Sequence, residues 1–281
     1  MKTGIIDTGG GLRGVYAAGV LDYCLENRIQ FDFGIGISAG SANITSFAAG
    51  QKKRNHKFYT VYSQRRQYMG ISNFLFKHTF IDMDYVYGTL SNSGGEYPLD
   101  YTALQKNPID FLIIATDAET GKPRYFTRKD LPLDNYQILK ASCAIPSVCK
   151  PYPVYGKYYY DGALGDPIPV EKAFENGCEK VILILTRPES EPRTPDKDIK
   201  LAKHIQKRYP AAAEQLRRRA DHYNQGVELA QKYASEGKLL IISPDNTCGV
   251  DTLTRDAAAL NKLYEKGFAD AAKIPLFLAA P

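Results

Sequence analysis

Short runs of consecutive apolar residues alternate with segments of helical spacing over the first 186 residues of the chain. The apolar runs stand at residues 3–7, 31–37, 110–118 and 180–186, and a further strand is expected at residues 122–127. Helical spacing follows or precedes them at residues 14–27, 42–50 and 170–177. Strands that lack polar alternation are buried on both faces, and the helices that connect them cover those faces. The pattern therefore predicts an α/β fold with a mainly parallel sheet covered by helices on both faces.

The sequence changes in character after Thr186. Residues 187–198 hold three prolines and many charges and are interpreted as a linker. Residues 199–236 are helical in spacing and basic, residues 237–246 contain one more strand, and residues 251–273 predict a last helix. We therefore expect a domain over residues 1–188 and a mostly helical C-terminal extension over 189–281. The alternative is that the late strand joins the main sheet and makes a single domain.

Composition excludes several classes of protein. Apolar residues make up 44% of the 281 residues and charged ones 24%, which is ordinary globular usage and argues against disorder. No apolar run reaches the length of a membrane span or a secretory signal. The five cysteines form no CxxC pair. Free thiols fit a reducing compartment, so we expect a cytoplasmic protein. The net charge of +5 identifies no partner.

A glycine-rich loop follows the first predicted strand. Residues Gly9 to Gly14 match GxGxxG and open the first predicted helix. Backbone amides at such a helix start favour negative charge, which could be a pyrophosphate or the oxyanion of a reaction intermediate. Asp32 stands about where a dinucleotide-binding fold carries its ribose-binding acid. The loop alone leaves both interpretations open.

A serine flanked by glycines follows the second predicted strand. Gly36, Ser38 and Gly40 form G-x-S-x-G between that strand and a predicted helix, as a nucleophile elbow requires. The tight turn strains the serine and leaves no room for bulky neighbours. The alternative is that Ser38 only caps the helix.

A serine nucleophile needs a group that takes its proton. None of the four histidines stands in a loop after a strand, and we expect surface or packing roles for His56, His78, His204 and His222. The other candidate is Asp161, in the D-G-A of residues 161–163. Burial beside the preceding tyrosines is expected to raise its pKa and make it a better base. The alternative is a turn aspartate that binds its own backbone.

The segments G-G-G-L-R-G, G-I-S-A-G and D-G-A, in this order, resemble the patatin-like phospholipases, acyl hydrolases with a Ser-Asp dyad. Residues 141–152 are also similar to that family's approach to its aspartate, and the resemblance covers about residues 1–186. It implies Ser38 as nucleophile and Asp161 as base. It implies an oxyanion hole of Gly10, Gly11, Arg13 and Ala39. The remaining motif positions are Gly9, Gly14, Gly36, Gly40, Gly162 and Ala163.

One departure from the family pattern concerns the first loop. Many members carry aspartate directly before the glycines, whereas this chain has Thr8 there and Asp7 one place earlier. The hydrogen bonds inside the loop are therefore left open. Arg13 either meets a substrate phosphate or anchors its loop.

The resemblance implies hydrolysis of fatty acyl esters of phospholipids, lysophospholipids or glycerides through an acyl-serine intermediate. No cofactor is implied, and no metal-binding motif occurs in the sequence. Two alternatives remain: a dinucleotide-binding oxidoreductase that uses the GxGxxG loop, and a lipid-binding protein with a silent dyad. The oligomeric state is not predicted.

Two segments are candidates for contact with lipid. Residues 71–90 alternate large apolar residues with polar breaks, as a substrate groove, a lid or ordinary core would. Residues 51–66 carry six basic and no acidic residues among aromatic ones. That composition suits peripheral contact with the anionic inner face of a membrane, a solvated helix face, or nucleic acid, for which no recognised motif is present.

Overall fold

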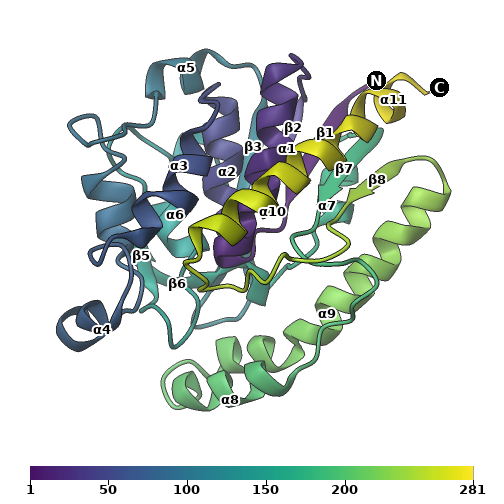
Figure 1. Ribbon diagram of the computed structural model, residues 1–281. Coiled ribbons are helices and arrows are strands. Elements are labelled where there is room, and N and C mark those ends of the chain that lie inside the picture. Colours follow the sequence, from purple (N-terminus) through teal and green to yellow (C-terminus); the bar gives the residue numbers. More distant parts are fainter. Residues whose placement is uncertain (281) are drawn as a thin grey trace.

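A computed structural model describes residues 1–280 of the chain. Eight strands form one sheet in the order β5-β6-β3-β2-β1-β7-β8, with β4 paired to β3 (Figure 1). The strands are β1 (Thr3–Asp7), β2 (Phe33–Ile37), β3 (Asp110–Asp117), β4 (Pro123–Thr127), β5 (Tyr152–Val154), β6 (Lys157–Asp161), β7 (Lys180–Ile184) and β8 (Leu239–Ile242). All pairings among β3, β2, β1, β7 and β8 are parallel, which confirms the mainly parallel sheet.

The antiparallel part of the sheet was not predicted in full. β4 and β6 both run antiparallel to β3, and β5 pairs with β6 as a hairpin. The sequence analysis found β4 but took the tyrosine-rich run before Asp161 only as context. Alternation is the only signal for so short a strand, and here tyrosines stand at consecutive positions. This hairpin matters for the site because β6 ends at Asp161.

Helices cover both faces of the sheet, as predicted. They are α1 (Val15–Glu26), α2 (Ala39–Ala48), α3 (Arg54–Thr60), α4 (Ile71–Lys77), α5 (Tyr101–Lys106), α6 (Gln137–Ser142), α7 (Val170–Glu175), α8 (Asp196–Ile205), α9 (Pro210–Ser235), α10 (Ala257–Asp270) and α11 (Ile274–Ala279). Neighbouring residues of β1 face opposite cores: Ile5 packs with α1, α2 and α10, and Ile6 packs with α7 and α9.

The C-terminal part of the chain packs onto the same sheet. β8 pairs with β7 in parallel, and α10 lies against α1, while α9 runs beside β8 (Figure 1). The boundary expected at residue 188 falls in the loop between β7 and α8 and stays a prediction about folding units. The mostly helical character predicted for residues 189–281 is confirmed over the described part. No helix within residues 1–280 has the length and hydropathy to cross a bilayer.

Candidate active site

Ser38 occupies a strained turn between β2 and α2. Its φ of 55° and ψ of −132° lie outside the regions that residues with a side chain prefer. A Cβ on Gly36 would lie 2.6 Å from Ser41 Cα, and one on Gly40 would lie 2.7 Å from Asp7 Cγ. Both glycines are therefore required by close packing, as expected for an elbow. The Ser38 side chain makes no helix-capping hydrogen bond, so the capping alternative is not supported.

Ser142 supports the turn from behind and was missed by the sequence analysis. The Ser38 N–H donates to Ser142 Oγ at 3.0 Å, and that hydroxyl donates to the Ile114 carbonyl at 2.6 Å. Ser142 lies at the end of α6, within the segment 141–152 that resembles the family. A buried serine without a motif of its own carries no signal in a single sequence. Its position under the turn follows only from the packing of α6 on β3.

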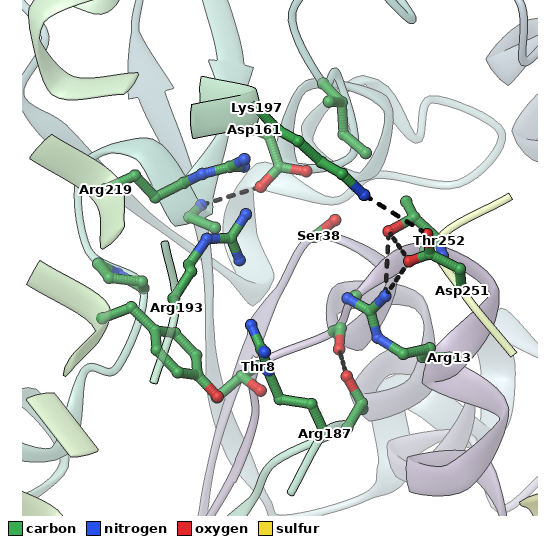
Figure 2. Close-up of a pocket in the computed structure, with 18 of the residues that line it drawn as sticks. Thr8, Arg13, Ser38, Asp161, Arg187, Arg193, Lys197, Arg219, Asp251 and Thr252 are labelled. Carbon is green, nitrogen blue, oxygen red and sulfur yellow. Dashed lines mark hydrogen bonds and ion pairs between the residues drawn. The ribbon is translucent and has the colours of Figure 1, made fainter. Parts of the chain in front are cut away.

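Asp161 lies at the end of β6 and is almost fully buried. Its Oδ1 accepts a hydrogen bond from the Ala163 N–H at 2.9 Å, as a turn aspartate would. Burial raises the pKa of the carboxyl group, and the nearby Ser38 side chain is the largest influence that lowers it. The predicted direction of the shift is thus confirmed. Figure 2 shows the Ser38 hydroxyl and the Asp161 carboxylate directed into one cavity.

The glycine loop lines the same cavity. Gly10 and Gly11 have φ values of 126° and 62°, which only glycine adopts without strain. Within residues 1–280 no acceptor is found for the N–H of either residue, although both residues line the cavity beside Ser38. Unpaired amides next to a nucleophile can stabilise a negatively charged oxygen. Ala39 begins α2 directly after Ser38, and its N lies next to the glycine loop, 3.0 Å from where a Cβ on Gly9 would be.

The departure at Thr8 changes the hydrogen bonds of the loop without removing its anchor. Asp7 Oδ1 accepts from the Gly9 N–H at 2.8 Å, and its Oδ2 accepts from Asn43 Nδ2 at 2.8 Å. The Thr8 hydroxyl donates to the Ile184 carbonyl at 3.0 Å. Arg13 Nη1 donates to Asp251 Oδ1 at 2.6 Å and to Thr252 Oγ1 at 3.2 Å. Arg13 therefore ties its loop to the C-terminal region.

A family model supports the motifs. Residues 8–174, more than half of the chain, match the model described as patatin-like phospholipase. The chain belongs to the patatin-like phospholipase family. Residues 209–274 match a second model, a domain of unknown function designated DUF6363.

Relatives of this patatin-like chain carry no established activity in their names. This chain is 28% identical over 200 residues to the uncharacterized protein YjjU of Escherichia coli, and the match covers 69% of this chain and 54% of that protein. It is 40% identical over 68 residues to an uncharacterized NTE family protein of Mycobacterium bovis, covering 24% of this chain and 18% of that protein. The chain thus spans about half of the first relative and less of the second. Among solved structures, VipD of Legionella pneumophila is similar with a TM-score of 0.49 and 11% identity, covering 97% of this chain and 66% of that one.

Two hollows of different chemistry meet at Ser38 of this patatin-like protein. The larger, of about 470 Å³, is lined by the glycine loop, Asp161 and several cationic side chains. The smaller, of about 60 Å³, is mainly apolar. Its apolar and aromatic lining residues are Leu12, Ala39, Ala42, Phe58, Tyr59, Tyr68, Met69, Ile81, Met83, Val86, Tyr87, Cys143 and Ile145. An ester bound at Ser38 could therefore place its apolar part in the smaller hollow and its polar part in the larger one.

The histidines and Asp32 lie away from this site. None of His56, His78, His204 and His222 lines either hollow. Asp32 directly precedes β2 and accepts hydrogen bonds from Thr3. It therefore lies at the amino ends of the parallel strands, whereas the glycine loop lies at their carboxyl ends. A ribose held at the glycine loop would be out of its reach. The geometry therefore argues against the dinucleotide-binding alternative.

The two segments considered for lipid contact divide between core and surface. Ile81 and Met83 line the apolar hollow, whereas Phe74 and Phe76 on α4 are exposed. In residues 51–66 the aromatic rings do not lie at the surface, as contact of these rings with lipid headgroups would require. Phe58, Tyr59 and Tyr62 are buried, and Arg54 is buried with them. These rings belong to the core beneath α3 and cannot lie at the level of lipid headgroups.

Proposed function

We propose that the protein hydrolyses fatty acyl esters of lipids through an acyl-Ser38 intermediate, with Asp161 as the base. The observation that carries the proposal is that a strained backbone turn presents the Ser38 hydroxyl beside Asp161, a buried residue whose pKa is raised. A carboxylate with a raised pKa is a stronger base than an exposed one and still lacks a proton at a pH above that pKa. No histidine is needed.

The reaction follows from the neighbours of Ser38. Asp161 takes the hydroxyl proton while Ser38 Oγ attacks the ester carbonyl. The N–H groups of Gly10 and Gly11 stabilise the resulting oxyanion, and Arg13 and Ala39 remain predicted further donors. The C–O bond to the alcohol breaks, and Asp161 returns its proton to that leaving group. Water then attacks the acyl-serine while Asp161 takes one of its protons. The ester bond to Ser38 Oγ breaks, Asp161 returns the proton to that oxygen, and the fatty acid is released.

The two hollows suggest how a lipid ester is oriented. The acyl chain enters the apolar hollow between Met69, Ile81 and Met83, because burial from water favours it there. The alcohol part of the ester then lies in the larger cavity, where charged side chains gather. Widening of the apolar hollow is required for a long chain, so short acyl esters are expected to react first.

Peripheral contact with a membrane is assigned to α4. The exposed fractions of Ile71, Phe74, Leu75 and Phe76 are 73%, 51%, 66% and 85%. The helix lies between Gly70 and Phe80, whose backbones are hydrogen-bonded, and next to Met69 and Ile81 of the apolar hollow. Large apolar side chains next to an acyl-chain site fit a lipid surface. A lipid leaving that surface would reach the hollow directly.

The test is labelling with a fluorophosphonate probe, followed by hydrolysis of short and long acyl esters. The probe is expected to label Ser38. Ser38→Ala and Asp161→Asn are expected to abolish hydrolysis, while Ser235→Ala and Asp221→Asn, at exposed positions, leave it intact. Ester hydrolysis that survives in Ser38→Ala refutes the assignment. Lipid binding without labelling would favour the silent lipid-binding alternative instead.

A further inference from the structure

The larger cavity beside Ser38 is rich in cationic side chains, and all of them except Arg13 come from outside the sequence motifs. The basic residues that line it are Arg13, Arg187, Arg193, Lys197 and Arg219. The acidic ones are Asp161, Asp198 and Asp251. A neighbouring hollow of about 610 Å³ shares Arg187 and Arg193 and continues the cavity toward residues 247–252. Positive charge therefore exceeds negative charge in the cavity beside Ser38. The neighbouring hollow adds Glu191 and Asp196 and holds equal numbers of basic and acidic residues.

Most of the carboxylates are already engaged. Asp198 is buried and receives two hydrogen bonds from Arg219, one of them at 2.9 Å from Nε. Asp251 is paired with Arg13 at 2.6 Å. Asp161 belongs to the proposed dyad. Among the arginines of the cavity, Arg187 and Arg193 are therefore the two whose positive charge is least compensated by a carboxylate.

Arg193 and Arg187 are both partly buried and poorly paired. Arg193 Nε lies 3.5 Å from Asp198 Oδ2 and has no hydrogen-bond partner within residues 1–280. Burial lowers the pKa of Arg193 to about 10, and the nearby charges of Arg219, Arg187 and Arg13 also lower it. Arg187 is 3.6 Å from Glu191, a side chain that is 60% exposed. The two guanidinium groups thus repel each other in a region where access of solvent is limited.

Figure 2 shows both guanidinium groups directed into the cavity that also receives the Ser38 hydroxyl. Partly buried cations that lack a partner are stabilised by an anion between them. A phosphate group, with several oxygens and a negative charge, can accept hydrogen bonds from two guanidinium groups at once. Neither family model covers residues 187 or 193, because the matches end at 174 and resume at 209.

We propose that Arg187 and Arg193 bind the phosphate of the substrate's headgroup and make acyl esters with an anionic headgroup the preferred substrates. This inference rests on the proposed hydrolase function, because it places the alcohol side of the ester in the cationic cavity. A zwitterionic headgroup brings its own cation into the same cavity and is disfavoured. A neutral glyceride leaves both arginines without an anion.

The test compares three dihexanoyl glycerides below their micelle concentration, with phosphoglycerol, phosphocholine or no headgroup, at one ionic strength. Arg193→Gln and Arg187→Gln are each expected to lower the ratio of kcat/KM for the phosphoglycerol ester over the neutral ester by about tenfold to 100-fold, the loss for a charged hydrogen bond. Arg193→Lys is expected to restore part of the ratio. Arg218→Gln removes the same charge from an exposed position of α9 and is expected to keep the ratio. Equal losses on all three esters, or no change in the ratio, overturn the proposal.

A binding experiment separates this inference from the proposed function. Ser38→Ala is titrated with hexanoyl-glycerophosphoglycerol, with hexanoylglycerol and with inorganic phosphate, using calorimetry. Tighter binding of the first ligand, lost in the double variant that also carries Arg193→Gln, supports the headgroup site even if no esterase activity is found. Inorganic phosphate that binds as tightly as the lipid indicates a free-phosphate site and overturns the headgroup assignment. Absence of binding by both phosphate compounds overturns it as well.

Discussion

Asp7 is a buried carboxylate beneath the glycine loop, and it makes the stability of the protein depend on pH in a defined way. The residue has no exposed surface and accepts hydrogen bonds from the Gly9 N–H and from Asn43. Burial raises its pKa from 3.8 to about 6, against the lowering effect of those two hydrogen bonds. The folded protein therefore holds the Asp7 proton more tightly than the unfolded chain.

The sign and size of the effect follow from linkage. The contribution of Asp7 is fully present below the unfolded pKa of 3.8 and is lost as the pH rises through about 6. A pKa difference of this size corresponds to about 3 kcal/mol of unfolding free energy, at about 1.36 kcal/mol for each pH unit. Between about pH 4.5 and 7.5, roughly 2 kcal/mol of that loss develops. Wild-type stability is expected to fall by this amount because of Asp7 alone.

The assay is urea unfolding of wild type and Asp7→Asn over this pH range. Asp7→Asn also places an amide NH₂ opposite Asn43 Nδ2, but that cost does not depend on pH and cancels when two pH values are compared. The difference in unfolding free energy, variant minus wild type, is expected to rise by roughly 2 kcal/mol toward higher pH. Asp110→Asn, at an exposed position, controls for loss of a charge. A difference that is the same at both ends of the range would show that Asp7 titrates normally.

Three further predictions concern the elbow, the base and the surface. Gly40→Ala places a Cβ 2.7 Å from a buried carboxyl carbon and is expected to cost about 3 kcal/mol of unfolding free energy, whereas Gly88→Ala has free space and is expected to cost far less, measured by urea unfolding. The acidic limb of kcat/KM is expected above the range of an exposed aspartate, because burial raises the pKa of Asp161 and protonation removes the base; a limb at an ordinary aspartate pKa contradicts this. Phe76→Ser is expected to weaken binding to anionic vesicles about tenfold in a flotation assay, and Leu276→Ser, equally apolar and 80% exposed on α11, is not. Equal effects of the two last variants would argue against docking through α4.

Local chemistry made the strand-turn-helix units readable from the sequence. Gly36 and Gly40 border a turn too tight for a side chain, and continuous apolar runs such as 180–186 can only be buried strands. Both features act between residues close along the chain, so they leave local patterns. The mainly parallel sheet and its two covering layers followed from those patterns. The family followed from the order of three short motifs.

Contacts between distant segments left no such pattern. Ser142 supports the Ser38 amide, and Asp251 holds Arg13, yet neither residue stands in a recognisable motif. The short hairpin of β5 and β6 was missed because its sequence lacks alternation, although it carries Asp161. The burial of Phe58 and Tyr62 in the core was likewise not visible from the composition of residues 51–66.

The sequence by itself indicated which side chains are candidates for chemistry: a serine on a forced turn, glycines that expose amides, and an aspartate in a D-G-A segment. Only the tertiary structure decided their surroundings. Desolvation raises the pKa of Asp7 and Asp161, and it depends on every segment that packs around them. The convergence of Arg187 and Arg193 on the cavity likewise depends on how the chain after β7 folds back over the carboxyl ends of the strands. Turn geometry is local in the chain, whereas burial and electric field are properties of the packed whole.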